Sequence, residues 1–342
     1  MTPPLTATRR VASTALDLPV FGLGTAHLGE LYGKVDEAQS QATLAAAWTA
    51  GVRFYDTAPW YGRGLAEHRL GGFLRTKPRD AVIVTTKVGR TLHRPADPPS
   101  FDRSPWVGGL NFEVDFDYSY DGIMRSYAQA LQRLALDTVD ALIVHDLDAG
   151  FHGGETERHF KALDGGIKAL DELKKAGQIK AIGCGINTSQ ALKQMVHRYD
   201  LDFCIVAMPY TLADQGGLDN GMDACVERGV SIIIGAPFAS GILVRGSRSD
   251  AAYGYAKAPE AIKTKVRAIE TVCDRHNVAL PAAALQFVLA HPAVVSVIPG
   301  AAKAEEVVAN LHSLEARIPA AFWKELKAES LIDPRAPVPG EG

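Results

Sequence analysis

The sequence has few cysteines, no long hydrophobic run and no large excess of charge of either sign. Its 342 residues include 4 cysteines, none of which belongs to a Cys-x-x-Cys pair. This argues against a zinc site and against a disulfide framework, so we expect no bound metal. Buried free thiols in a reducing compartment are the simplest interpretation of Cys184, Cys204, Cys225 and Cys273.

Further absences concern membranes and nucleic acids. Residues 1–10 have no apolar core of signal-peptide length, and no later segment has the length of a transmembrane helix. The net charge is -3 and lysines and arginines are scattered, which leaves no electrostatic footprint for nucleic acid or an anionic membrane. We therefore expect a cytoplasmic protein whose partner is a small molecule. No heptad seam or exposed apolar stripe indicates an oligomeric state.

What the sequence does contain is a regular alternation of strand and helix patterns. Apolar, β-branched runs predict eight strands, at 20–25, 53–56, 81–86, 139–144, 180–184, 203–207, 231–235 and 294–298. Helical patterns follow them at 36–50, 67–74, 123–134, 157–176, 189–199, 219–227, 260–275 and 304–312. Near-continuous apolar strands indicate a parallel sheet covered by helices, and eight repeats favour a closed TIM (β/α)8 barrel over an open sheet.

A Rossmann fold is disfavoured, because His27 stands where a GxGxxG motif that starts at Gly22 and Gly24 requires its third glycine. With no linker in the sequence, we expect one domain over residues 1–342. Residues 88–120 form a long insertion after the third strand, and we expect it to serve as a lid or binding loop. The alternative is that this loop has no role in binding. Residues 281–290 predict an extra helix outside the barrel, and the proline-rich tail, 333–342, is expected to be frayed.

Four ionisable side chains lie at or just beyond the carboxyl ends of predicted strands. Asp56 ends the second strand with Tyr61 shortly after it, Lys87 follows the third strand and His145 follows the fourth. Each residue alone has an ordinary structural explanation, such as a cap, packing or solvation. A barrel brings the carboxyl ends of its strands to one mouth, where barrel enzymes have their active sites. We therefore predict that these four side chains converge.

Several motifs together resemble those of the aldo-keto reductases. They are Phe54-Tyr-Asp-Thr-Ala-Pro-Trp-Tyr-Gly, Thr86-Lys-Val-Gly, His145-Asp-Leu-Asp, Ile179-Lys-Ala-Ile-Gly, Ala236-Pro-Phe-Ala-Ser-Gly-Ile-Leu and Ile298-Pro-Gly-Ala. The resemblance runs from about Val20 to about Leu314 and implies a barrel that holds a nicotinamide cofactor at its mouth. Within the family the sequence is most similar to the bacterial group of aldose 1-dehydrogenase, L-fucose dehydrogenase and pyridoxal 4-dehydrogenase, partly through Gly183-Cys-Gly-Ile-Asn.

The resemblance implies a catalytic tetrad of Asp56, Tyr61, Lys87 and His145. A phenol has a reference pKa of about 10, and a neighbouring ammonium favours its ionised form. Lys87 is expected to supply that charge, Asp56 to hold Lys87, and His145 to orient the substrate oxygen. Tyr61 then acts as general acid in reduction or as general base in oxidation. The hydride moves to or from the nicotinamide.

The resemblance also implies a set of residues that contact the cofactor. They are Thr25, Asp56, Asn187, Pro237, Phe238, Ser240, Gly241, Pro299, Gly300, Glu306 and Asn310. NADPH-dependent members of the family place a lysine and an arginine where this sequence has Gly300 and Glu306. A carboxylate repels a 2'-phosphate but accepts hydrogen bonds from ribose hydroxyls, so we expect the cofactor to be NAD. The alternative is that Glu306 is simply solvated and Lys303 binds a phosphate.

Departures from the family pattern concern the nicotinamide end. The usual Ser-Asn pair after the fifth strand matches Gly185 and Ile186, with Asn187 one place later in the amide role. The usual glutamine of the sixth strand falls near Cys204, and the usual stacking tyrosine falls at Gly235. Phe238 or Tyr210 is a candidate to support the ring instead.

The subgroup points to oxidation of a ring carbon that bears hydrogen and hydroxyl, as in a cyclic aldose such as L-fucose or the internal hemiacetal of pyridoxal. The product is a lactone. Trp60, His93 and Trp106 are the candidate substrate contacts. Two alternatives stay open: an NADPH-dependent aldehyde or ketone reductase, and a non-enzymatic module that senses the cofactor.

Overall fold

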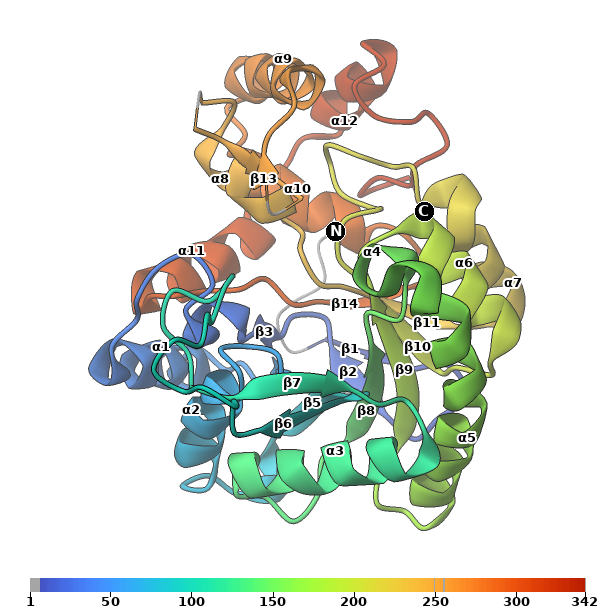
Figure 1. Ribbon diagram of the computed structural model, residues 1–342. Coiled ribbons are helices and arrows are strands. Elements are labelled where there is room, and N and C mark those ends of the chain that lie inside the picture. The colour runs from blue at the N-terminus through green and yellow to red at the C-terminus, as the bar shows by residue number, and fades with distance from the viewer. Residues whose placement is uncertain (1–6, 249, 255, 342) are drawn as a thin grey trace.

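Eight parallel strands close into a barrel (Figure 1). The computed structural model describes residues 7–248, 250–254 and 256–341. Its main sheet has the strand order β14-β11-β10-β9-β8-β5-β4-β3. Main-chain bridges join Phe21 to Val297 and Gly24 to Gly300, so the first strand meets the last. The predicted TIM barrel is confirmed. The strands are β3 (Leu23–Gly24), β4 (Phe54–Asp56), β5 (Ile83–Val88), β8 (Ala141–His145), β9 (Ala181–Ile186), β10 (Phe203–Val206), β11 (Ser231–Ile234) and β14 (Val294–Val297).

A helix follows each barrel strand, and the predicted positions hold to within a few residues. The helices are α1 (Glu37–Thr49), α2 (Leu65–Leu74), α3 (Tyr120–Leu134), α5 (Thr156–Lys175), α6 (Ser189–Arg198), α7 (Asp223–Arg228), α9 (Glu260–His276) and α11 (Ala304–Glu315). The start of α1 follows from local chemistry, because the Asp36 carboxylate accepts a hydrogen bond of 2.8 Å from the main-chain N–H of Gln39. The helix predicted from residue 219 begins later, since a π-helical segment, η4 (Leu218–Met222), precedes α7.

Two apolar cores follow from the alternation of side chains along each strand. One lies inside the barrel and includes Phe54, Ile143, Phe203 and Ile233, all fully buried. The other, larger core lies between the strands and the surrounding helices. Leu18 joins the inner core from a hairpin that the sequence did not predict, formed by β1 (Thr8–Arg10) and β2 (Asp17–Pro19).

The insertion after the third barrel strand carries secondary structure of its own. Within residues 88–120, β6 (Arg90–His93) pairs in antiparallel register with β7 (Glu113–Phe116). Between these strands the chain turns back to the body of the protein, where Trp106 is buried. The insertion is therefore a two-stranded hairpin that leads straight from β5 and packs beside the barrel.

Shorter elements complete the chain. They are α4 (Ala149–His152), α8 (Ile242–Arg245), α10 (Leu280–Leu289), α12 (Ala320–Ala328), the pair β12 (Ala252–Tyr253) and β13 (Ala256–Lys257), and the 3-10 turns η1 (Ala26–Gly29), η2 (Arg79–Ala81), η3 (Gly153–Glu155) and η5 (Ala239–Gly241). Helix α10 is the extra helix predicted at 281–290. Helices α9 and α12 pack against each other at the edge of the molecule, and α9 also contacts α10 (Figure 1).

The tail differs from its prediction. Residues 333–342 were expected to be frayed, but Ala336 and Val338 are buried in the outer core. Arg335 also donates two hydrogen bonds, of 2.6 and 2.8 Å, to the carboxylate of Asp219. Proline content signals an absence of regular structure, and here irregular backbone packs well through its side chains. The last residue, 342, lies outside the described residues.

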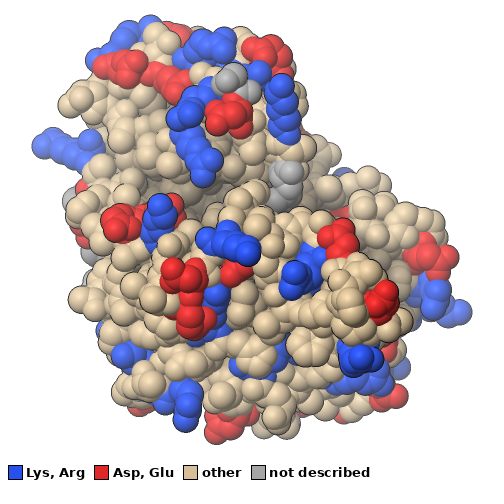
Figure 2. All heavy atoms as spheres, turned by 60° about the vertical axis from the view of Figure 1, so that its left-hand side comes forward, with Lys and Arg blue, Asp and Glu red and all other residues tan. Residues whose placement is uncertain are grey.

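The structure describes the environment of the cysteines, the apolar character of the helices and the distribution of charged side chains. All four cysteines are buried and free, as expected. Among the described residues, no helix is both long and apolar enough to cross a membrane, and no group of three or more potential ligands has a metal-binding arrangement. Figure 2 shows acidic and basic side chains interspersed over one face, with a hollow between its upper and lower parts.

Candidate active site

Three of the four predicted catalytic residues face the interior of the barrel at its mouth. Asp56 ends β4 two residues after the inward-facing Phe54, and His145 ends β8 two residues after the inward-facing Ile143. Lys87 stands near the end of β5 and reaches Asp56. Side chains alternate along a strand, so every second residue faces the interior of the barrel. These polar groups therefore face the same interior as the apolar core residues, at its open end. Tyr61 lies in the turn that follows β4.

The Lys87 ammonium is fixed by two acceptors. Its Nζ donates to Asp56 Oδ2 at 2.7 Å and to the main-chain oxygen of Thr57 at 2.8 Å. The other carboxylate oxygen, Asp56 Oδ1, accepts from Thr85 Oγ1 at 2.8 Å. Both side chains of the ion pair are only 3% exposed. This burial and bonding hold the ammonium in one place.

Tyr61 is brought next to Lys87 and His145. Lys87 Nζ lies 4.7 Å from the centroid of the Tyr61 ring, and the rings of Tyr61 and His145 meet edge to face with centroids 6.0 Å apart. The structure thus gathers the four predicted residues at one mouth, although they lie far apart in the sequence. Their catalytic roles stay a prediction.

The electrostatics of the phenol differ from the simple expectation. Burial raises the pKa of Tyr61 well above its ordinary value, the charges of Asp56 and Asp146 raise this pKa further, and the charge of Arg90 lowers it. Because Lys87 is paired with Asp56 at 2.7 Å, the two opposite charges largely offset each other at the phenol. Burial likewise lowers the pKa of His145, with smaller contributions from Arg90 and Lys87, so its ring is neutral near pH 7.

A second buried ion pair stands beside the first, and the sequence did not predict it. Arg90 Nη2 donates to Asp146 Oδ2 at 2.8 Å, and this same oxygen lies 3.1 Å from His145 Nε2. The other oxygen, Asp146 Oδ1, accepts from Asn187 Nδ2 at 2.9 Å. In the sequence, Arg90 comes just after a predicted barrel strand and Asp146 is next to the predicted histidine, and these positions were the available signals for the ion pair. Neither signal says that the two groups meet.

The residues predicted to contact a cofactor lie along the mouth where the barrel closes. Thr25 is buried and its Oγ1 donates to the main-chain oxygen of Asp56 at 3.0 Å. Gly24 N–H donates to the oxygen of Pro299 at 3.1 Å, and Gly300 pairs with Gly24. Asn310 Nδ2 approaches the oxygen of Gly300 at 3.5 Å.

Gly300 and Glu306 have specific neighbours here. A Cβ at Gly300 would lie 2.3 Å from Nδ1 of His27, so this ring fills the space in which a larger residue would start. Glu306 Oε2 accepts a 2.7 Å hydrogen bond from the main-chain N–H of Ala302. Burial lowers the pKa of His27, and Glu306 opposes this effect. His27 Nδ1 is buried without a partner among the described residues, which leaves a polar atom available to a ligand.

The loop after β11 supplies Pro237, Phe238, Ser240 and Gly241. Ser240 and Gly241 have positive φ angles of 59° and 97°, which give a tight turn at the mouth. Asn187 offers a buried amide oxygen with no partner among the described residues. Unpaired side-chain atoms in this region fit a nucleotide, which presents many donors and acceptors.

The structure shows where Cys204 and Tyr210 lie relative to the mouth of the barrel. Cys204 points away from the mouth into the outer core, with its Sγ 3.3 Å from that of Cys184, because it alternates with the inward-facing Phe203 and Ile205. It cannot replace a glutamine at the nicotinamide. Tyr210 is fully buried and stacks on Phe287, so it does not support the ring either.

Gly185, by contrast, faces the site. A Cβ at this glycine would lie 3.6 Å from Lys87 Cε and 4.0 Å from Cδ2 of His145. The glycine therefore leaves open space between two tetrad residues. Phe238 remains the candidate to support the nicotinamide.

The three predicted substrate contacts fall into two groups. The Trp60 and Trp106 rings pack edge to face with centroids 5.7 Å apart, and the Trp106 centroid lies 6.0 Å from that of Tyr61. His93 instead pairs with Asp115 at 3.2 Å and Glu113 at 3.5 Å on β7. The structure therefore brings the tryptophans to the tetrad, whereas the described contacts of His93 are with the hairpin.

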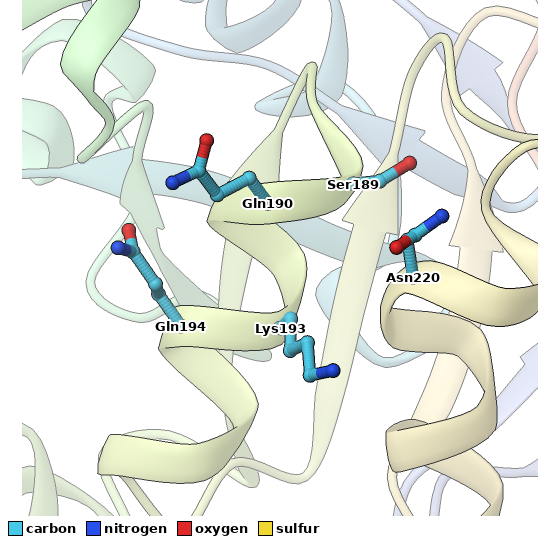
Figure 3. Close-up of a pocket in the computed structure, with 5 residues that line it drawn as sticks. All are labelled: Ser189, Gln190, Lys193, Gln194 and Asn220. Atoms are coloured by element: carbon cyan, nitrogen blue, oxygen red, sulfur yellow. The ribbon is translucent and has the colours of Figure 1, made fainter.

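Hollows also occur away from the tetrad. One of about 500 Å³ lies between α6 and η4, and its lining is Ser189, Gln190, Lys193, Gln194 and Asn220 (Figure 3). Another of about 680 Å³ is lined by residues that include Leu16, Arg79 and Lys180, at the opposite end of the barrel from the tetrad. Neither lining includes a tetrad residue, so the convergence of charged groups, not the size of a hollow, locates the candidate site.

Comparisons with known proteins agree with this geometry. The chain is 40% identical over 334 residues to pyridoxal 4-dehydrogenase from Microbacterium luteolum, covering 95% of this chain and 97% of that one. It is 37% identical to D-threo-aldose 1-dehydrogenase from Pseudomonas sp, over 94% of this chain and 97% of that one. In fold it resembles the aldo-keto reductase AKR11C1 from Bacillus halodurans in its holo form, with a TM-score of 0.73, 23% identity and 98% of both chains covered.

The family assignment rests on nearly the whole barrel. The family description Aldo/keto reductase matches residues 20–330, a range that contains every strand of the barrel and all four tetrad residues. Together with two relatives above 30% identity over most of the chain, this match settles the assignment. The protein belongs to the aldo/keto reductase family.

Proposed function

We propose that this protein oxidises a cyclic hemiacetal to its lactone with NAD, using Tyr61 as the general base. As a member of its family it is an oxidoreductase that uses a nicotinamide cofactor and acts on a small molecule. The observation that carries the finer proposal is the meeting of Tyr61, His145 and the buried Lys87–Asp56 pair at the barrel mouth. The relatives named above are dehydrogenases of pyridoxal and of an aldose.

Each tetrad residue has a role that its contacts support. Tyr61 takes the proton from the hydroxyl of the ring carbon that is oxidised. His145, neutral because burial lowers its pKa, hydrogen-bonds the same substrate oxygen and orients it. Asp56 fixes Lys87, whose ammonium stays beside the phenol ring throughout. An oxidised nicotinamide bound at the mouth would supply the hydride acceptor and a positive charge there.

The raised pKa of Tyr61 has a consequence for this proposal. A phenol with a raised pKa holds its proton in the free protein, so it is a poor base until positive charge is added nearby. The mouth contains two ion pairs, each with a carboxylate that offsets its cation. We infer that Tyr61 would act as the general base only when a bound oxidised cofactor adds positive charge at the mouth.

We propose a preference for NAD from the residues that are expected to lie beside the adenosine ribose of the cofactor. Glu306 is held by Ala302 N–H, and its carboxylate would repel a 2'-phosphate while accepting hydrogen bonds from ribose hydroxyls. His27 occupies the space beside Gly300, where a family lysine for the phosphate would begin. The charge of Arg245 lowers the pKa of His27, so this region contains a cation as well as the carboxylate of Glu306.

The test is a matrix of cofactors and substrates. The protein is mixed with NAD or NADP and with pyridoxal, L-fucose and other aldoses, while the absorbance of the reduced cofactor is followed and products are identified by mass. We expect lactone formation with at least one hemiacetal and a higher kcat/KM with NAD than with NADP. A preference for NADP would reject the cofactor proposal, and aldehyde reduction without hemiacetal oxidation would favour a reductase. No turnover of any substrate, with intact cofactor binding, would favour a sensing module.

A further inference from the structure

A buried arginine at the mouth is enclosed by aromatic rings. Arg90 opens β6, two residues after the end of β5, and its side chain has no exposed surface. Its guanidinium carbon lies 5.2 Å from the ring centroid of Trp60, 5.1 Å from that of Phe116 and 5.0 Å from that of Phe151. We call these four residues the Arg90 cage. Because its rings come from three separate segments of the chain, only the folded protein assembles it.

The guanidinium in this cage is not fully satisfied. Nη2 donates to Asp146 Oδ2 at 2.8 Å, whereas Nε and Nη1 are buried and make no hydrogen bond of good geometry among the described residues. A weaker interaction with the Tyr118 hydroxyl partly satisfies the guanidinium. This hydroxyl donates to the main-chain oxygen of His145 at 2.7 Å. An arginine side chain is always charged and buried unpaired donors are costly, so the N–H groups of Nε and Nη1 are strong hydrogen-bond donors to any acceptor that reaches them.

Two features place these donors where a substrate can use them. Phe116 and Phe151 are 38% and 43% exposed, so the outer wall of the cage lies at the protein surface. On the inner side, Asp146 links Arg90 to His145, whose Nε2 lies 3.1 Å from the same carboxylate oxygen. A ligand oxygen at the guanidinium would therefore lie close to the tetrad, between aromatic faces.

We propose that the Arg90 cage is the subsite for an acidic oxygen on a planar substrate ring, next to the carbon that is oxidised. The inference rests on the proposed function and narrows its substrate class. A guanidinium prefers an anionic acceptor, and aromatic walls suit a flat ring. Pyridoxal carries an ionisable ring hydroxyl beside its aldehyde carbon, whereas an aldose offers only neutral hydroxyls. The cage thus favours the hydroxypyridine over the sugar.

The first test changes the substrate and leaves the protein intact. Removing the ring hydroxyl from pyridoxal should lower kcat/KM by about 10- to 100-fold, because two charged donors then lose their acceptor. Equal kcat/KM values with and without the hydroxyl would overturn the proposal. If the protein oxidises aldoses but not pyridoxal, the cage proposal fails while the proposed function stands. If it oxidises no hemiacetal, the proposed function itself fails.

The second test changes the arginine. Arg90→Met should reduce kcat/KM for pyridoxal by about 10- to 100-fold, with a much smaller effect on the analogue that lacks the hydroxyl. Equal losses on the two substrates would mean that Arg90 acts only through Asp146 and His145, which contradicts the proposal. Arg90→Lys, which keeps the charge but loses the planar fork, should show an intermediate loss.

Binding provides a readout that does not depend on turnover. Pyridoxine carries the same ring hydroxyl but no aldehyde, and its Kd should rise at least about tenfold in Arg90→Met. An unchanged Kd in a folded variant would reject the subsite. The matched control is Arg63→Met, since the guanidinium of Arg63 lies 5.0 Å from the Trp60 ring but donates to main-chain oxygens such as that of Phe112. This control should affect pyridoxal and its analogue equally.

Discussion

Tyr61 and its charged neighbours define the site at the scale of single residues. The phenol stands among two cations and two carboxylates, and burial together with the carboxylates raises its pKa. An ammonium close to a phenol does not by itself make an acidic phenol, because its partner carboxylate cancels much of the field. The sequence supplies all the charged groups, but the net effect depends on how they are paired.

The role of Tyr61 can be tested with a substitution that removes one oxygen atom. Tyr61→Phe should reduce kcat by about 100- to 10,000-fold, because the proton acceptor is lost while the ring contacts with Trp106 and His145 are kept. Cofactor affinity, measured by fluorescence titration, should stay nearly unchanged. Turnover within a few fold of the unmodified protein would exclude Tyr61 as the base. The matched control is Tyr120→Phe, a change in a tyrosine that is 37% exposed and whose hydroxyl donates to Glu172, and it should leave kcat unchanged.

Among the elements of structure, the Asp36 cap of α1 and the strand period were reliable features of the sequence. Asp36 marks the start of α1, and the inward-facing positions of β4 and β8 lead directly to Asp56 and His145. The insertion was predictable in position but not in form. Its β6–β7 hairpin delivers Phe116 to Arg90, a contact between the two ends of one hairpin.

The start of α1 provides a prediction at this scale. Asp36→Ala should lower the free energy of unfolding by about 1 kcal/mol, because the N–H of Gln39 loses the cap that it donates to at 2.8 Å. Asp36→Asn should restore most of the loss, since asparagine caps equally well. Urea unfolding monitored by circular dichroism measures both variants. Equal losses in the two variants would show that the charge, and not the cap, stabilises this end of the helix.

At the scale of the whole molecule, buried histidines couple stability to pH. Burial is the main reason that the pKa values of five buried or half-buried histidines lie below the ordinary value; they are His27, His145, His152, His159 and His291. For His152 and His291 the pKa is lowered to about 4. The unfolded chain therefore binds more protons than the folded chain between pH values of about 4 and about 6.5. Asp56 and Asp146, whose pKa values burial raises, act in the opposite sense.

Stability should consequently fall as the pH is lowered from about 7 to about 5. Each histidine that stays neutral in the folded state contributes a slope of up to about 1.4 kcal/mol per pH unit. Urea midpoints measured across this range test the expectation, and a constant or rising midpoint at lower pH would contradict it. His291→Gln should flatten the slope by up to one such contribution, because it removes one buried titrating ring.

The sequence alone predicted the barrel and the meeting of Asp56, Tyr61, Lys87 and His145 at its mouth. Both depend on local periodicity and on motifs that a short segment carries: strands of period two, capped helices, and ionisable residues at strand ends. The tertiary structure decided what depends on neighbours from distant segments. It paired Arg90 with Asp146, turned Cys204 away from the mouth, placed His27 against Gly300 and packed the tail on the barrel. Burial and pairing of charges are properties of the closed fold, and no single segment contains them.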